Sequence, residues 1–261
     1  MSQDSKISFK QRIDFGKESS LLVWYPRIKG LPIPQVQTEI AGTGHKPLYD
    51  FMVNEKPIPE NVYEKMYQAM ERIGKYPMFM RTDQSSAKHS WKDTCFLTSK
   101  DKLNHNLSFL IENHEMQNMA GELGYEAVVF REFLDLESYF TTDFYGDFPV
   151  NKEVRCFIRD GSFVSMHNYW FDDAVKQGHP HDTKWRAKLK KLNTIGKGDK
   201  MMIKAHLNLV SPRFQDYWSV DFAKGKNGIW YLIDMARGEV SYHPENVIEK
   251  FDDMNSKGLR K

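Results

Sequence analysis

The chain has 261 residues, of which 40% are hydrophobic and 28% charged, a composition typical of a globular protein with a substantial core. Its 37 Lys and Arg residues nearly balance its 35 Asp and Glu residues, and the net charge of +2 argues against a general attraction to nucleic acid or membranes. A polar N-terminus, no long apolar run and only two cysteines predict a cytoplasmic protein without a membrane span, a disulfide framework or a zinc cluster.

The first half of the chain predicts strands alternating with two helices. Val62, Met66, Met70 and Ile73 recur at helical spacing, which predicts an amphipathic helix over Asn61–Ile73. A second helix is expected from Ser99 to about Met119, after a loosely packed segment 1–20 and a set of short strands. These strands are expected at Leu21–Tyr25, Val36–Ile40, Tyr76–Arg81, Thr94–Leu97 and Ala127–Phe133.

The second half begins with an aromatic, acidic linker, residues 134–147, and then predicts a hairpin. Asp160-Gly161 suits a two-residue type I′ turn, in which both positions need a positive φ. This turn would pair Arg159 with Ser162, which places Asn168 opposite Glu153. One strand face would then carry Glu153, Arg155 and Asn168 together, although solvent-exposed salt bridges would explain the same pattern.

A second predicted hairpin turns at Asn227-Gly228, another type I′ pair. Pairing Lys226 with Ile229 would place Phe222 opposite Ile233 and Asp221 opposite Asp234. Two carboxylates facing each other on neighbouring strands repel, which favours a cation between them, and an all-oxygen pair suits Mg²⁺ better than zinc. The alternative is a different register in which both aspartates are solvated.

Two more segments contain groups that suit a nucleotide. The loop from Arg81 to Asp93 combines small residues, hydroxyls, Lys88 and Lys92, as expected of a loop that closes over phosphates or simply of an exposed polar loop. In Phe130–Leu134 the backbone could hydrogen-bond a purine edge, with Glu137 near enough to reach a ribose, although aromatic residues in a strand are more often core. Basic groups combined with paired carboxylates predict a nucleoside triphosphate site.

Taken in order, these motifs resemble the ATP-grasp superfamily. The chain is most similar to the branch that contains a eukaryotic cell-division-cycle protein, an assembly factor for translation initiation factor 2, and its phage and bacterial relatives. The resemblance covers roughly Tyr76–Val240 and rests on four motifs. These are the loop starting at Arg81, the hinge after Phe130, the Glu153-Val-Arg155-Cys-Phe-Ile strand and the Leu232-Ile-Asp234 strand preceded by Asp221.

The resemblance implies an α+β fold in which two lobes with mostly antiparallel sheets grip Mg·ATP. It implies an N-terminal segment 1–60 packed on both lobes, a smaller lobe 61–134 and a larger lobe 135–261 that holds the metal. The implied roles are phosphate binding by Arg81 and by Lys88 or its rival Lys92, adenine binding by Glu132, Phe133 and Leu134, and ribose contact by Glu137. They continue with a catalytic pair, Arg155 near the γ-phosphate and Lys88, and with metal binding by Asp221 and Asp234.

One position departs from the family pattern. The asparagine expected two residues after the second metal carboxylate is Ala236, which cannot bind a metal, so Asn168 or water would have to substitute. The implied activity is an ATP-dependent ligase that joins an unknown carboxylate to an amine through an acyl phosphate. The alternative is a non-catalytic ATP-binding assembly factor for a protein client.

Three C-terminal features have simpler explanations. His179-Pro-His181 could be a metal pair but is more typical of a polar loop. The basic stretch Thr183–Leu192 could bind an acidic partner, yet its spacing fits a solvated helix face. His243–Met254 is expected to be a closing helix.

Overall fold

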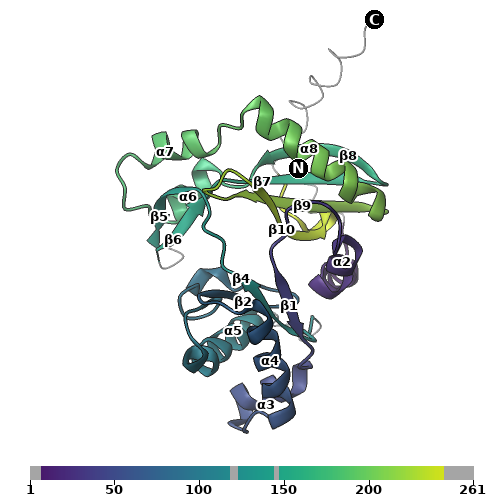
Figure 1. Ribbon diagram of the computed structural model, residues 1–261, viewed down its shortest axis with the longest axis vertical. Helices are drawn as coiled ribbons and strands as arrows, with labels where there is room; N and C mark the ends of the chain where they lie inside the picture. The colour runs from purple at the N-terminus through teal and green to yellow at the C-terminus, as the bar shows by residue number, and fades with distance from the viewer. Residues whose placement is uncertain (1–6, 118–122, 144–146, 244–261) are drawn as a thin grey trace, which may run out of the picture.

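The computed structural model describes residues 7–117, 123–143 and 147–243. Two four-stranded antiparallel sheets organise it, one in the lower and one in the upper half of Figure 1. Helices cover the outer face of each sheet, giving the mixed α+β architecture that the sequence predicts. Within the described part of the chain, no helix has both the length and the apolar character needed to cross a membrane.

The first sheet has the strand order β1-β4-β2-β3 and is covered on one face by three helices. The strands are β1 (Thr38–Ala41), β4 (Val128–Glu132), β2 (Met78–Thr82) and β3 (Phe96–Leu97). The helices are α3 (His45–Asn54), α4 (Glu60–Ile73) and α5 (Leu103–Gln117), which share one core with the sheet. Helix α4 buries the four predicted apolar residues and ends at Gly74, whose φ of 73° allows the left-handed cap.

The second sheet has the strand order β10-β9-β7-β8. Its strands are β10 (Trp230–Arg237), β9 (Tyr217–Lys224), β7 (Glu153–Arg159) and β8 (Ser162–Asn168). Its apolar face packs against α2 (Leu21–Ile28) and α8 (Lys197–Val210). The opposite face carries charged side chains, because residues alternate between the two faces along each strand.

A third, aromatic cluster lies beside the second sheet, at the left of Figure 1. It joins a two-stranded sheet, β5 (Ser138–Thr142) and β6 (Phe148–Asn151), to the short helices α6 (Asp172–Gln177) and α7 (Trp185–Leu192). The prediction that residues 134–147 are only linker is therefore wrong, since β5 lies inside this stretch. The predicted basic helix face corresponds to α7.

The N-terminal predictions need correction. The expected strand at Leu21–Tyr25 is helix α2, whose N-cap Ser20 accepts a hydrogen bond from the backbone of Leu22. Leu21, Trp24, Tyr25 and Ile28 are buried at helical spacing, but a short apolar run does not distinguish strand from helix. The segment 1–20 also contains a helix, α1 (Phe9–Glu18), which starts with a capping box between Ser8 and Gln11.

The N-terminal segment contributes to both halves of the molecule. Helices α1 and α2 contact β10 of the second sheet, whereas β1 pairs with β4 in the first. The predicted domain boundaries, 1–60, 61–134 and 135–261, stay a prediction. Apart from His243, the expected helix His243–Met254 lies outside the described residues.

Candidate functional site

The Asp221–Asp234 pairing is confirmed, although the predicted turn is wrong. Gly228 has a φ of 82°, but Asn227 has no positive φ, and the Gly225 amide donates to the Ile229 carbonyl across a longer loop. This loop shifts the pairing by one residue, so Phe222 faces Leu232 instead of Ile233. A β-bulge at Ile233 then restores the register and places Asp234 opposite Asp221.

The other hairpin has the predicted type I′ turn, with φ of 47° at Asp160 and 77° at Gly161, and Arg159 pairs with Ser162. A register shift between Phe157 and Ile158 then changes the partners further along. Asn168 faces Val154 rather than Glu153, and Arg155 faces His167. Because Val154 belongs to the apolar core, the register directs Asn168 away from the charged face.

Four polar residues therefore form a row across the second sheet. His167, Arg155, Asp221 and Asp234 lie on consecutive strands and are directly paired. The Arg155 guanidinium donates from Nε to Asp221 Oδ1 and from Nη2 to Asp221 Oδ2, both at 2.8 Å. Such a bidentate pair fixes the orientation of both groups.

The first sheet supplies the counterion for the second aspartate. Arg81, at the end of β2, places its Nη1 3.0 Å from Asp234 Oδ1, and its side chain is almost fully buried. Burial disfavours ionisation of Asp234, but Arg81 and Arg131 outweigh it and hold the pKa of this carboxyl below its usual range. Both predicted metal carboxylates are therefore paired with arginines.

A pocket lies between the two sheets and encloses about 240 Å³. Its walls include six of the residues predicted from the sequence. These are Arg81, Lys88, Glu132, Phe133, Leu134 and Asp234. Arg155 and Asp221 do not line this pocket, but they lie next to Asp234 in the row across the sheet.

The two candidate phosphate lysines occupy different places. Lys88 lines the pocket, and its Nζ lies 5.6 Å from the centre of the Tyr169 ring. Burial disfavours its charged form, but Tyr169 and the carboxylates of Glu153 and Asp234 raise the pKa of Lys88 above its usual range. Lys92 instead forms an exposed ion pair with Asp147 at 2.8 Å, outside the pocket.

The predicted adenine hinge directly follows β4 and forms part of the pocket wall. The Glu132 carboxylate accepts hydrogen bonds from the Gln37 amide and Lys75 Nζ, so it is already engaged outside the pocket. Phe133 packs against Trp91 and Phe96. Glu137 accepts a hydrogen bond from Tyr139 Oη at 2.6 Å and does not line the pocket.

Two pocket residues have properties that the sequence did not indicate. Glu153 is 3% exposed, its Oε2 has no hydrogen-bond partner, and burial raises its pKa. Arg131 is 5% exposed, and burial, together with nearby Arg81, lowers its pKa to about 10. An arginine inside the apolar run before the hinge was the available signal for Arg131, and the prediction did not use it.

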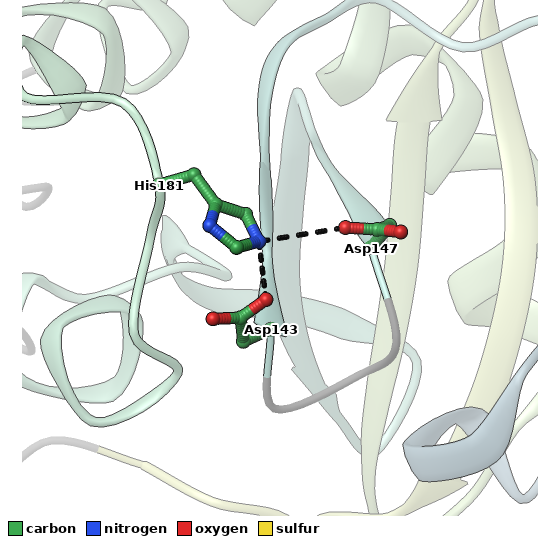
Figure 2. A group of neighbouring side chains, drawn as sticks. All are labelled: Asp143, Asp147 and His181. Carbon is green, nitrogen blue, oxygen red and sulfur yellow. Dashed lines mark ion pairs between the residues drawn. The ribbon is translucent and has the colours of Figure 1, made fainter.

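A separate cluster lies outside the pocket. Figure 2 shows His181, from the loop before α7, between Asp143 and Asp147 at the adjoining ends of β5 and β6. His181 pairs with Asp143 and lies 3.5 Å from Asp147, and Lys92 also pairs with Asp147. All three side chains are exposed, and these ion pairs account for the carboxylates.

Comparison with known families identifies the fold. A sequence model of the ATP-grasp domain, family 3 of its clade, matches residues 70–254. The chain belongs to this family. Its membership confirms the ATP-grasp resemblance and supports ATP as the ligand of the pocket.

Solved structures agree on the fold. Cdc123 from Schizosaccharomyces pombe aligns with a TM-score of 0.55 at 9% identity, covering 86% of this chain and 85% of that one. A C-terminally truncated form of the same protein gives 0.56 at 11% identity, with the same coverage. D-alanine–D-alanine ligase from Bacillus anthracis gives 0.45 at 13% identity, covering 85% of this chain and 57% of the ligase. No match was found among curated protein sequences.

Proposed function

We propose that the protein binds Mg·ATP in the pocket between its sheets and uses it to join a carboxylate to an amine. The observation that carries this proposal is the convergence of opposite charges from both sheets. Arg81, Lys88 and Arg131 come from the first sheet and its loop, and Asp221 and Asp234 from the second. Cations without enough carboxylates to match them suit phosphates, and paired carboxylates suit a divalent cation.

The donor set fits magnesium. Asp221 and Asp234 offer only oxygen ligands from directly paired positions, and Mg²⁺ prefers oxygen ligands and is bound through one or two carboxylates plus substrate phosphates. The buried Glu153 Oε2 adds an acceptor without a partner on the pocket wall. When bound, the ion neutralises charge that develops on the phosphates.

The residues of the chain would then position and neutralise the nucleotide. Phe133 and Leu134 supply apolar surface for adenine, and Glu137 remains a proposed ribose contact. Arg81 and Lys88 neutralise phosphate charge, and Arg155, fixed by Asp221, points its guanidinium along the row toward the γ-phosphate. Asn168 is the weakest of the proposed metal ligands, because its register directs it to the other face.

In the proposed reaction, a carboxylate oxygen of the substrate attacks the γ-phosphorus, and ADP leaves with the electrons of the broken phosphoanhydride bond. The amine then attacks the acyl carbon of the acyl phosphate, inorganic phosphate leaves, and the amine loses a proton. The pocket supports the first partner, ATP, whereas the identities of the carboxylate and the amine remain open.

One observation favours a second candidate function, a non-catalytic ATP-binding assembly factor. Ala236 occupies the position at which the family pattern has a metal-binding asparagine, and it pairs with Ser219 in the next row of the sheet. A site with fewer protein ligands can hold Mg·ATP without directing phosphoryl transfer. The extensive fold similarity to Cdc123 agrees with this candidate, since the branch that the sequence resembles includes an assembly factor.

The two functions are separated by turnover. Purified protein is incubated with ATP, Mg²⁺ and pooled amino acids or peptides, and ADP formation is followed, with Asp234→Asn as the inactive control. ADP that forms only with an acceptor, and not with Asp234→Asn, supports the ligase. Tight ATP binding without ADP in any pool supports the assembly factor, and no ATP binding contradicts both.

A further inference from the structure

The β-bulge at Ile233 determines which way Asp234 points. Leu232 pairs with Phe222 and Asp234 pairs with Asp221, so Ile233 is an extra residue with no partner on β9. Without the bulge, the pairing that holds from Trp230 to Leu232 would place Asp234 opposite Val220, a residue of the apolar core. A one-residue shift turns a side chain to the other face of a sheet, so the carboxylate reaches the site only because of the bulge.

Arg131 contacts the bulge from the opposite sheet. It lies on β4, and its Nη1 donates to the carbonyl of Ile233 at 2.5 Å. Its Nε donates to Thr38 Oγ1 at 3.0 Å, on the neighbouring strand β1. The guanidinium thus donates two hydrogen bonds to a carbonyl and a hydroxyl, although burial of a charged group is costly. The contact with the bulged residue gives this buried arginine a specific role.

We propose that Arg131 is a positioning residue that holds the bulge at Ile233 and thereby keeps Asp234 opposite Asp221. This inference rests on the proposed Mg·ATP site. Because Arg131 immediately precedes Glu132–Leu134, the same contact ties the adenine hinge to the metal carboxylate. The consequence is specific: Arg131 controls the part of ATP affinity that depends on magnesium.

The competing role is direct binding of a phosphate by Arg131, since this residue also lines the pocket. The two roles differ in their response to Arg131→Lys. Lysine keeps the positive charge but lacks the planar guanidinium that reaches Ile233 and Thr38 together. A phosphate contact would largely survive this change, whereas the bulge contact would not.

The test is titration calorimetry with ATP, once with Mg²⁺ and once with EDTA, on four proteins. These are the wild type, Arg131→Lys, Thr38→Val and Asp234→Asn. We expect Arg131→Lys to reduce the magnesium-dependent gain in ATP affinity on the order of tenfold, as loss of a group that orients a metal ligand does, and to leave the affinity in EDTA unchanged. Thr38→Val, which removes the other hydrogen bond of Arg131, keeps the gain, and Asp234→Asn loses it.

Binding of Mn²⁺ in the presence of ATP, followed by electron paramagnetic resonance, provides a second readout, and thermal unfolding verifies that each variant is folded. The inference is overturned if Arg131→Lys keeps the full magnesium-dependent gain, or if it weakens ATP binding equally in EDTA. A loss of the gain in Thr38→Val would also overturn it. If the wild type binds no ATP, the proposed function itself fails, which is a different result from an unaffected Arg131→Lys.

Discussion

The two lysines of the loop after β2 show how single residues divide between binding and surface roles. Lys88 faces the pocket and its neighbouring carboxylates, and Lys92 pairs with Asp147 in solvent. We predict that Lys88→Ala weakens ATP binding roughly 10- to 100-fold, because it removes a charge-assisted contact of about 1.5–3 kcal/mol. The matched Lys92→Ala leaves the affinity unchanged. Calorimetry on both variants measures this difference, and equal effects would contradict the assignment.

His167 predicts a pH dependence of stability. Burial, reinforced by nearby Arg155 and His243, lowers its pKa from 6.5 to about 4, against the favourable influence of Asp221 and the Asn168 carbonyl. Between these two pKa values the unfolded chain binds more protons at this residue than the folded chain. The stability contribution is therefore fully present above pH 6.5 and is lost as the pH falls toward 4, by about 3 kcal/mol.

Replacing His167 isolates this contribution. His167→Phe should unfold with a free energy that falls less between pH 7 and 4.5 than that of the wild type, because other titrating groups are common to both proteins. Urea unfolding at the two pH values measures the difference. Parallel pH profiles would show that His167 does not titrate as the structure implies.

At the scale of elements, the sequence predicted what depends on local periodicity. The apolar spacing of α4 and the Asp160-Gly161 turn were both confirmed. Leu21–Tyr25 was wrong because its helical state depends on the cap at Ser20 and on packing with the second sheet, neither of which a five-residue apolar run reveals.

The register of the second hairpin was right at one pair for the wrong reason. The prediction assumed a two-residue turn at Asn227-Gly228, and the actual loop is longer, but the bulge at Ile233 compensates by one residue. Bulges are fixed by contacts from other elements, here Arg131 on β4, so pairing arithmetic within one hairpin does not find them. The same limitation explains why Asn168 was assigned to the wrong face.

The confirmed hairpin turn provides a prediction for stability. Gly161 has a φ of 77°, and a Cβ there would meet no atom closer than 3.8 Å, so strain and not collision determines the cost of a side chain. Gly161→Ala should destabilise the protein by about 1–2 kcal/mol. Gly198→Ala in α8, where a Cβ meets nothing and φ is not positive, should instead stabilise by about 0.5–1 kcal/mol. Urea unfolding compares them, and a stable Gly161→Ala would contradict the turn geometry.

At the scale of the whole molecule, the site exists only where the two sheets meet. Arg81 and Arg131 extend from the first sheet to Asp234 and to the Ile233 carbonyl of the second. The sequence indicated most participants, since the motifs at Arg81, Lys88, Phe133 and Asp234 all reach one pocket. It did not indicate that arginines already pair with both aspartates, because that depends on how the sheets face each other.

The central claim is that Mg·ATP binds between the sheets, and a crystal structure with Mg²⁺ and a non-hydrolysable ATP analogue tests it most directly. The account predicts adenine against Phe133 and Leu134, phosphates at Arg81 and Lys88, and the metal between Asp221 and Asp234. An analogue bound elsewhere, or a pocket that stays empty at saturating analogue, would contradict it.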